Sequence, residues 1–459
     1  MPSLRTVFFC TECGNESLRW QGQCPVCQAW NTLVEEPTQR TGRRGGAPSS
    51  ARERSAATSV VRIGDVPGAE VRRWRTGIDE LDFVFGGGLV PGSIVLLGGE
   101  PGIGKSTLLL QAAARLEAAN LRTFYVSGEE SAAQVRMRAD RIPESASAVA
   151  FLAETDVDAI IERATELRPD VLIVDSIQTV HAGGVEGAPG NVTQIRECAA
   201  RFQRWAKEGG SVVLLVGHVT KEGTVAGPRT LEHLVDTVIY FEGSDTLDHR
   251  LLRATKNRFG GVDEIGVFRM TSGGLVPVEN PSELFLRQRS SGSGAAVAAV
   301  MEGSRPLLVE VQALCARASY GAPQRVTTGF DRQRLALLLA VLEKRVGIPF
   351  GQLDVFVNVV GGVRLKEPAS DLAVAAALVS SSRDQPLQFD AVFLGEVGLG
   401  GELRLVGQVE RRLIEAARQA FRLAYVPAAV VAARAPAGLE VRGLSDLSTV
   451  VGELFQPPA

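Results

Sequence analysis

The sequence predicts a multidomain protein of the α/β class, and three observations support this prediction. Its 459 residues exceed what a single hydrophobic core usually organises. Between about residues 63 and 280, short apolar runs alternate with helical stretches, which indicates a largely parallel sheet buried on both faces. Four cysteines gather before residue 28, and from about residue 285 to 459 a separate α+β pattern follows.

Composition and charge exclude several classes of protein. A hydrophobic content of 45% and a charged content of 22% are typical of a globular chain. The net charge is -3, so any nucleic-acid surface has to be a local patch. No segment reaches the roughly 18 apolar residues that a membrane span needs. The first nine residues do not resemble a signal peptide. We therefore expect a cytoplasmic protein that has no membrane partner.

The first 35 residues are predicted to be a zinc finger. They carry two C-x-x-C pairs separated by ten residues: Cys10, Cys13, Cys24 and Cys27. Four thiolates form a closed tetrahedral Zn²⁺ site, so the metal is expected to be structural. Trp20 and Trp30 are expected to pack a minimal core that needs the metal to fold. Two disulfides are the alternative, which a reducing compartment disfavours.

A linker is predicted between this module and the central domain, over residues 36–62. Residues 37–62 are rich in Thr, Ser, Gly, Ala and Pro, and they carry six Arg against one Glu. Such a composition is typical of a flexible chain. A solvated tether and a nucleic-acid contact both remain open.

The central domain is expected to alternate strands with helices. Predicted strands cover residues 93–98, 122–127, 171–175, 211–216 and 237–242. Predicted helices cover residues 111–119 and 194–207. A polar, Gly/Ser-rich break at 287–294 precedes the C-terminal domain. Strands at 294–301 and 307–313 and helices at 331–346 and 370–380 are predicted after it.

A phosphate-binding loop is the most specific motif of the chain. The pattern G-x-x-x-x-G-K-[ST] begins at residue 99, with an apolar strand before it and a helical stretch after it. The predicted ATP-binding residues are Gly99, Glu100, Pro101, Gly102, Ile103, Gly104, Lys105, Ser106 and Thr107. This strand–loop–helix context predicts an ATP site and makes a chance glycine-rich turn the weaker interpretation.

The loop chemistry assigns roles to particular residues. Gly102 and Gly104 let the backbone curl so that its N–H groups point at phosphates, and the following helix adds positive potential. Lys105 is expected to reach the β- and γ-phosphates, and Ser106 to bind Mg²⁺.

Two acidic positions are predicted to complete the catalytic site. Asp175 ends an apolar strand and is expected to hold Mg²⁺ through water. Hydrolysis also needs a group that orients the attacking water. Glu129 follows another predicted strand and is our candidate, with Glu130 as the second choice and two solvated surface acids as the alternative.

Several segments resemble the RecA-type recombinase ATPases, and in particular the RadA/Sms family of bacterial DNA repair proteins. The lead-in to the loop reads T-G-I-D-E-L-D from Thr76 and F-G-G-G-L-V-P-G from Phe85. The pentapeptide K-N-R-F-G starts at Lys256 and is specific for RadA/Sms. The resemblance covers nearly the whole chain except the linker. It implies a RecA-like P-loop ATPase domain at residues 63–280.

The resemblance also implies assembly and contacts with DNA. Such domains are expected to form a homo-oligomeric ring, a hexamer, with ATP at the subunit interfaces. Lys256 and Arg258 are then expected to reach the neighbouring subunit's nucleotide, and Lys256 to influence DNA binding. A cation supplied in trans would stabilise charge on the transferring phosphoryl group. A basic surface loop is the alternative.

Further residues follow by the same resemblance. His218 ends a predicted strand and is the candidate γ-phosphate sensor. The glycine-rich basic loop after it corresponds to a mobile DNA-binding loop, in which Lys221 and Arg229 are the predicted DNA contacts. Residues 181–193 correspond to a second, flexible DNA-facing loop.

The C-terminal region, residues 285–459, resembles the proteolytic domain of Lon. The segments G-V-R-L-K-E-P-A-S-D from Gly362 and L-G-E-V-G-L-G-G-E-L from Leu394 carry this resemblance. Lon uses a Ser–Lys dyad. Ala369 and Glu410 fall at the dyad positions here, and the adjacent Ser370 has no obvious basic partner. We therefore expect a scaffold without peptidase activity.

Together these features predict a DNA-dependent ATPase of recombinational repair. As a ring on single-stranded DNA it would drive branch migration with helicase-like translocation. Its expected cofactors are ATP, Mg²⁺ and structural Zn²⁺, and its expected partners are single-stranded DNA, branched DNA and the RecA recombinase. The alternatives are an ATP-dependent protease relative and a KaiC-like ATP-gated switch without motor activity.

Overall fold

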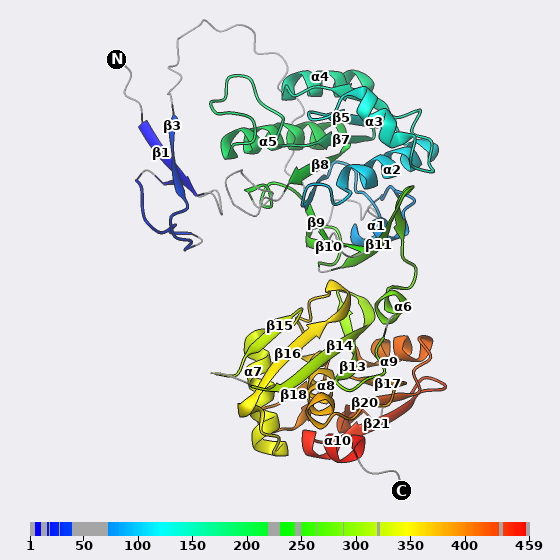
Figure 1. The fold of residues 1–459 in the computed structure, drawn as a ribbon. Helices are drawn as coiled ribbons and strands as arrows, with labels where there is room; N and C mark the ends of the chain where they lie inside the picture. The colour runs from blue at the N-terminus through cyan, green and yellow to red at the C-terminus, as the bar shows by residue number, and fades with distance from the viewer. Residues whose placement is uncertain are drawn as a thin grey trace, which may run out of the picture. The chain divides into compact units, whose positions relative to one another are not determined.

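The structure is a computed structural model that describes residues 5–10, 16–17, 19–26, 28–38, 72–218, 230–243, 249–262, 264–287, 289–318, 322–430 and 435–455. The chain divides into two compact units (Figure 1). The N-terminal unit comprises residues 1–242, 251–262 and 270–276, and the C-terminal unit comprises 243–250, 263–269 and 277–459.

The N-terminal unit carries the α/β core that the sequence predicts. From residue 72 onward its elements are α1 (Asp79–Val84), β4 (Ile94–Gly99), α2 (Lys105–Ala118), β5 (Thr123–Ser127), α3 (Ala132–Ala139), β6 (Ala150–Ala153), α4 (Val157–Leu167), β7 (Val171–Asp175), α5 (Val192–Gly209) and β8 (Val212–His218). The strands β9 (Thr237–Gly243), β10 (His249–Asn257), β11 (Ile265–Thr271) and β12 (Gly274–Pro277) follow.

These strands form a nine-stranded sheet within the described residues. The strand order is β12-β11-β10-β9-β4-β8-β7-β5-β6. The neighbours β9-β4, β4-β8, β8-β7, β7-β5 and β5-β6 are parallel. Parallel strands joined through helices place all their carboxyl ends at one edge, which is where α/β proteins bind ligands.

Buried side chains explain why these segments are strands and helices. One face of the sheet packs against α4 and α5 through a cluster that includes Leu96, Val126, Leu172, Ile195 and Phe202. The strands β4, β5 and β7 are buried along their whole length, and β4 and β7 are mostly Val, Ile and Leu, as expected for a parallel sheet covered on both faces. Both predicted helices and all five predicted strands of this region are present, with ends shifted by a few residues.

The N-terminal module is a small antiparallel sheet made of β1 (Arg5–Cys10), β2 (Glu16–Ser17) and β3 (Leu33–Thr38), in the order β2-β1-β3. Among the described residues of this module, Cys10, Cys24 and Leu33 are buried, with Phe8 packed against them. The prediction that two tryptophans form this core is wrong. Trp20 is 58% exposed and Trp30 is 70% exposed, because the two rings lie beside Gly22 while Cys10, Cys24 and Leu33 are buried.

The C-terminal unit is α+β, as predicted. Its elements are α6 (Pro281–Leu286), β13 (Ala295–Glu302), β14 (Arg305–Arg317), β15 (Arg325–Thr328), α7 (Arg332–Val341), β16 (Leu353–Val359), α8 (Asp371–Arg383), β17 (Ala391–Phe393), β18 (Glu396–Val397), β19 (Leu403–Arg404), α9 (Val409–Arg418), β20 (Leu423–Pro427), β21 (Glu440–Leu444) and α10 (Leu447–Leu454). The seven-stranded sheet β15-β16-β14-β13-β17-β20-β21 mixes antiparallel and parallel neighbours.

Sequence and structure agree closely on the helices of this unit. The predicted helix at 331–346 is α7, capped by Asp331 and continued by a π-helical turn at Leu342–Val346.

Among the described residues, no helix combines the length and the apolar character that crossing a bilayer requires.

Candidate nucleotide site

The carboxyl edge of the parallel sheet gathers most of the predicted site residues. Gly99 at the end of β4 pairs with His218 at the end of β8. Ser127 at the end of β5 pairs with Asp175 at the end of β7, and Glu129 follows Ser127 by two residues. Residues that are up to 119 positions apart in sequence (99 to 218) therefore meet at one edge of the sheet.

The phosphate loop connects β4 to α2 as the motif predicts. Gly102 has a φ of 77°, and Gly104, which precedes the first turn of α2, has a φ of 116°. These left-handed conformations favour glycine, because a Cβ atom would strain them. The amino end of α2 therefore opens directly onto the loop, where its N–H groups and helix dipole favour an anion.

Lys105 is the buried cation of the site. It is 3% exposed, and its Nζ donates hydrogen bonds to the carbonyl oxygens of Gly99 and Glu100, each at 2.8 Å. Burial lowers the pKa of Lys105 to about 8, against the opposing attraction of Asp175 and Glu129. An ammonium has three N–H donors, so one remains for a phosphate oxygen.

Asp175 is held by a hydroxyl from the neighbouring strand. The Tyr125 hydroxyl donates a hydrogen bond of 2.5 Å to Oδ2 of Asp175, which is 6% exposed. Burial and the adjacent Asp175 carboxylate raise the pKa of Tyr125 well above its ordinary value, so this hydroxyl remains a donor. Asp175 therefore presents a fixed carboxylate, the kind of oxygen ligand that suits Mg²⁺.

Glu129 is oriented by groups on two other elements. The Ser176 hydroxyl donates to Oε1 of Glu129 at 2.5 Å, and Nε2 of His218 lies 3.3 Å from the same oxygen. The neighbouring His218 ring lowers the pKa of Glu129 to about 2; the Ser176 hydroxyl and Lys105 act in the same direction, and burial opposes them. Its side chain is 43% exposed and lines an open cleft with Ser131 and Thr155.

Glu130, the second choice for orienting water, has another role. Its carboxylate forms an ion pair with Arg138 on α3. Its backbone N–H donates to the Ser127 hydroxyl at 2.9 Å. Glu130 thus contacts Arg138 and the turn after β5, while Glu129 is the acid that faces His218 and Ser176.

His218 carries unsatisfied hydrogen-bonding capacity at this edge. Both of its ring nitrogens are buried; Nε2 lies 3.3 Å from Oε1 of Glu129, and Nδ1 has no hydrogen-bond partner among the described residues. The neighbouring Gln178 donates through Nε2 to the His218 carbonyl oxygen at 3.1 Å, while its own Oε1 is buried without a partner in the described part of the chain. Buried polar atoms of this kind usually serve a ligand or a water.

Lys256 and Arg258 lie at the other end of the same sheet. The Arg258 N–H donates to the carbonyl oxygen of Asp236 at 3.1 Å, and its guanidinium lies 3.0 Å from the Asp236 carboxylate. Asp236 in turn bonds to Ile94, the first residue of β4. The phosphate loop leaves the last residue of β4, roughly 16 Å of strand away.

The structure therefore does not bring these two cations to the phosphate loop of their own chain. The Nζ of Lys256 donates to the Glu232 carbonyl oxygen at 2.5 Å. Burial lowers the pKa of Lys256, and the nearby Arg258 lowers it further. The Arg258 side chain is 54% exposed, so it remains accessible from outside this chain.

The two predicted DNA loops differ in what can be described. Lys221 and Arg229 lie outside the described residues. The loop at 181–193, predicted to be flexible, is tied down by the buried Gln194. The Gln194 Nε2 donates to the carbonyl oxygens of Val185 at 2.7 Å and Gly187 at 3.2 Å, and its Oε1 accepts from the Ala182 N–H at 2.7 Å. This loop therefore has a defined conformation.

Two of the four predicted zinc ligands can be described. Cys10 is fully buried, and Cys24 is 1% exposed. The turn at Cys24 is closed by hydrogen bonds from the Gln28 N–H to the Cys24 carbonyl and from the Cys24 N–H to the Ala29 carbonyl, both at 2.9 Å. Buried thiols in so small a module fit a structural metal. Cys13 and Cys27 lie outside the described residues.

The region that resembles Lon has a buried polar interior. Ala369 and Ser370 are both buried, and the Ser370 hydroxyl donates to the Glu367 carbonyl oxygen at 3.1 Å. The Arg412 guanidinium is buried and bonds to both carboxylate oxygens of Glu367, at 2.5 and 2.7 Å. The sequence segment around Ser370 and the helix α9 are therefore joined by an ion pair.

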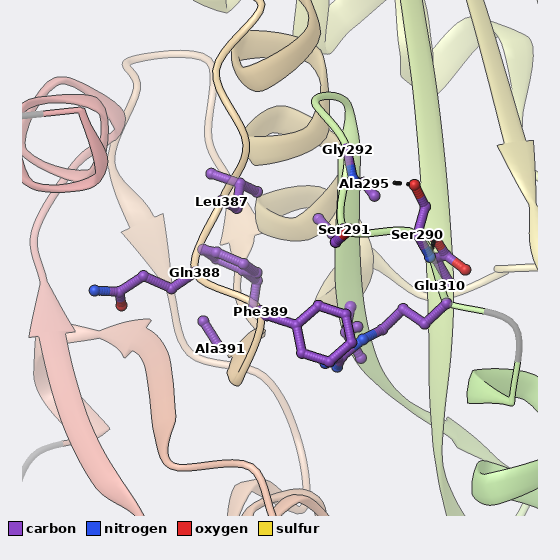
Figure 2. A pocket seen from close by; sticks show the side chains of 13 residues that line it. Ser290, Ser291, Gly292, Ala295, Glu310, Leu387, Gln388, Phe389 and Ala391 are labelled. Atoms are coloured by element: carbon purple, nitrogen blue, oxygen red, sulfur yellow. Dashed lines mark hydrogen bonds between the residues drawn. The ribbon is translucent and has the colours of Figure 1, made fainter.

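A small pocket in the C-terminal unit has mixed walls (Figure 2). The guanidinium of Arg289 lies over the Phe389 ring, 3.5 Å from its centre. The buried carboxylate of Glu310 accepts from the Ser290 N–H at 3.0 Å and from Gln312 at 3.3 Å. These polar groups bond to one another, so we assign the pocket no ligand.

Sequence reasoning missed Tyr125, Ser176 and Gln178. Tyr125 stands in a strand that reads as buried packing, and its hydroxyl function depends on which strand lies beside it. Ser176 was easier to predict than Tyr125, because it directly follows Asp175 and a hydroxyl after a strand-ending acid lies at the edge of the site. Gln178 carries no motif.

Family models match three parts of the chain. Residues 62–224 match an AAA domain, and residues 8–35 match a rubredoxin metal-binding domain. Residues 324–430 match the subunit ChlI of Mg-chelatase, within the predicted Lon-like domain. The two N-terminal matches agree with the RecA-like ATPase core and the zinc ribbon predicted from sequence. A KaiC-like protein of Pyrococcus horikoshii, a solved structure, matches 45% of this chain and 99% of its own at 21% identity, with a TM-score of 0.39.

Curated relatives match nearly the whole chain. A DNA repair protein RadA from Bacillus subtilis is 46% identical over 98% of both chains. A second, from Pseudomonas aeruginosa, is 49% identical over 99% of this chain and 100% of its own. A third, from Brucella abortus, is 51% identical over 93% of this chain and 92% of its own. On identity of this level across all domains, the chain belongs to the RadA family of DNA repair proteins.

Proposed function

We propose that this protein is an ATP hydrolase whose site lies at the carboxyl edge of the nine-stranded sheet. The observation that supports this most is the arrangement around Lys105. A buried cation stands at the start of α2, and it attracts two carboxylates, Asp175 and Glu129, from the two strands that end beside it. An ATPase of the RadA family needs these groups together.

ATP would bind along residues 99–107, with its phosphates at the loop N–H groups and at Lys105. Ser106 and Asp175 would hold Mg²⁺, directly and through water. The metal ion supplies positive charge that stabilises the transferring phosphoryl group. The chain itself would supply the Asp175 carboxylate, whose Oδ2 accepts a hydrogen bond from Tyr125 and whose other oxygen would be the one to act on the metal ion's water.

Glu129 would orient the attacking water, and His218 would sense the γ-phosphate. Their spacing of 3.3 Å supports a joint role, because a change at one side chain reaches the other directly. The Nδ1 atom of His218, which has no partner in the described part of the chain, could exchange a hydrogen bond with a phosphate oxygen. Because the pKa of Glu129 is about 2, it is a weak base and is better suited to orienting water than to holding its proton.

Lys256 and Arg258 would act on the nucleotide of the neighbouring subunit in a homo-oligomeric ring, a hexamer. Two facts support action in trans. Both residues lie at the far end of the sheet from their own phosphate loop, and Arg258 is exposed. ATP at such an interface would couple hydrolysis to assembly.

DNA is the proposed substrate of the ring. The relatives are named as DNA repair proteins, which supports a role on single-stranded and branched DNA, with hydrolysis driving branch migration and RecA as a partner. Lys221, Arg229 and Lys256 are the proposed DNA contacts. Cys10, Cys13, Cys24 and Cys27 would hold a structural zinc ion.

One experiment tests these proposals together. The ATPase rate is measured with and without single-stranded DNA, alongside strand displacement on a branched substrate. We expect stimulation by DNA and ATP-dependent displacement, and loss of both in the Lys105→Ala variant. Turnover that DNA does not change would argue for an ATP-gated switch instead of a motor. Turnover retained without Lys105 would refute the site itself.

A further inference from the structure

Two buried hydroxyls hold the two carboxylates of the candidate site. The Tyr125 hydroxyl donates to Oδ2 of Asp175, and the Ser176 hydroxyl donates to Oε1 of Glu129, both at 2.5 Å. Tyr125 is 1% exposed and Ser176 is fully buried. Water therefore does not reach either donor, and the Asp175 acceptor is buried as well, whereas the Glu129 acceptor lies at the edge of the open cleft.

The two hydrogen bonds cross between neighbouring strands. Tyr125 belongs to β5 and holds the acid that ends β7, while Ser176 follows β7 and holds the acid that follows β5. The strands are parallel and in register, with Ser127 opposite Asp175. Each acid is thus fixed by a residue of the other strand, and a shift between the strands would disturb both.

We propose that Tyr125 and Ser176 are positioning residues with separate tasks. Tyr125 aims the Asp175 carboxylate at the water shell of the metal ion, and Ser176 aims the Glu129 carboxylate at the attacking water. This inference rests on the proposed function of Asp175 and Glu129. In both acids the hydroxyl occupies one oxygen and leaves the other for the task.

Simple satisfaction of buried polar groups is the competing explanation. A buried tyrosine hydroxyl needs a partner, and a nearby carboxylate would serve even in a protein without this activity. The two explanations differ in what removal of the hydroxyl group changes. If the hydroxyl is purely structural, its removal lowers thermal stability and changes neither the Mg²⁺ requirement nor kcat. A positioning hydroxyl changes one kinetic quantity specifically.

The test compares Tyr125→Phe with Ser176→Ala in the full chain, each variant serving as the control for the other. For Tyr125→Phe we expect the Mg²⁺ concentration for half-maximal ATPase to rise about tenfold, with a rate near wild type at saturating Mg²⁺. For Ser176→Ala we expect kcat to fall about 10- to 100-fold, with an unchanged KM for ATP and an unchanged Mg²⁺ requirement.

Binding of ADP without Mg²⁺ reports whether each variant is folded. Wild-type affinity is expected in both. Loss of ADP binding would overturn the division of tasks in favour of a structural role, and so would variants that each raise the half-maximal Mg²⁺ concentration and lower kcat together. Unchanged kinetics in both variants would overturn it as well.

A double substitution separates this inference from the function on which it rests. In a Glu129→Gln background, Ser176→Ala should lower the rate no further, because its effect passes through Glu129. If Glu129→Gln alone retains the wild-type rate, the proposed function of Glu129 fails. If Glu129→Gln is inactive while Ser176→Ala is fully active, only the positioning role fails.

Discussion

At the scale of single residues, the electrostatics of the candidate site depend on one cation and two acids. Burial lowers the pKa of Lys105 to about 8, although Asp175 and Glu129 attract its charge. The pKa of Glu129 moves to about 2, so this carboxylate stays ionised at neutral pH. Near neutral pH, Glu129 therefore stays charged, and Lys105 is the group that loses its charge as the pH rises through about 8.

The first prediction concerns the protonation of Lys105. Phosphate binds the ammonium form, so ATP affinity should fall as the pH rises through about 8. Bound phosphate raises the pKa of the lysine, and binding near pH 8.5 should therefore take up a proton. Calorimetry in two buffers of different ionisation enthalpy measures this uptake.

The Lys105→Arg variant is the control for that measurement, because its guanidinium stays protonated in this range. Any binding it retains should show no proton uptake. Wild-type binding without proton uptake at pH 8.5 would show that the amine is already fully charged, contrary to this prediction.

At the scale of elements, the join between the phosphate loop and α2 has strict backbone requirements. Gly102 and Gly104 both have positive φ, but their surroundings differ. A Cβ at Gly102 would meet nothing within 4 Å, whereas one at Gly104 would lie 2.9 Å from the Met270 side chain and 3.1 Å from Leu275. The start of α2 is therefore packed, and the tip of the loop is open.

Alanine substitutions should separate these two positions. Gly102→Ala meets only the backbone penalty, about 1–2 kcal/mol. Gly104→Ala adds overpacking, for a total of about 2–4 kcal/mol, and should displace Lys105 and weaken ATP binding more than tenfold. Thermal unfolding and ATP titration of both variants check this. Equal losses in the two variants would mean that packing against Met270 and Leu275 contributes little.

The elements also show how far sequence reasoning extends. The strands β4, β7 and β8 were predictable because each contains a continuous run of at least four Val, Ile or Leu residues, β5 because Phe, Tyr and Val favour strands, and the phosphate loop because its motif fixes its residue types. The strand order was not predictable, so the bond from Tyr125 to Asp175 was hidden. The prediction for the two tryptophans was wrong because aromatic residues usually favour a core, whereas in this small module Cys10, Cys24 and Leu33 are the buried residues among those described.

At the scale of the whole molecule, the chain combines parts that differ in their source of stability. The central sheet has an extensive apolar core that includes Leu96, Val126 and Phe202. The described part of the N-terminal module buries only Cys10, Cys24 and Leu33 with Phe8 beside them, and a segment of about 35 residues rarely offsets the entropy of folding with apolar surface alone. Metal ligation is expected to supply the remainder.

Removing the metal should therefore affect one part of the protein only. With a zinc chelator, amide hydrogen exchange in residues 5–38 should become fast, while β4 stays protected and the affinity for ATP is unchanged. Mass spectrometry of exchanged peptides and ATP titration measure the two effects. Simultaneous loss of ATP binding would contradict an independent module, and continued protection of residues 5–38 would contradict a structural metal.

The opposite ends of the central sheet carry the two halves of the proposed interface site. Lys105 stands where β4 ends, and Arg258 is tied through Asp236 to the residue where β4 begins. A head-to-tail ring brings unlike surfaces of neighbouring copies together at every interface. The geometry within one chain is thus suited to a nucleotide shared between two subunits.

Mixing inactive subunits tests that sharing. The Lys105→Ala and Lys256→Ala variants should each be inactive alone, and mixed rings should recover activity at interfaces where an intact Lys105 meets a neighbour's intact Lys256. Random equal mixing produces such interfaces at about one position in four, so roughly a quarter of wild-type ATPase is expected. As the control, a chain with both substitutions mixed with Lys256→Ala should recover nothing, since no subunit then supplies Lys256. If the first mixture also stays inactive while rings of mixed composition form, Lys256 acts within its own chain or outside catalysis.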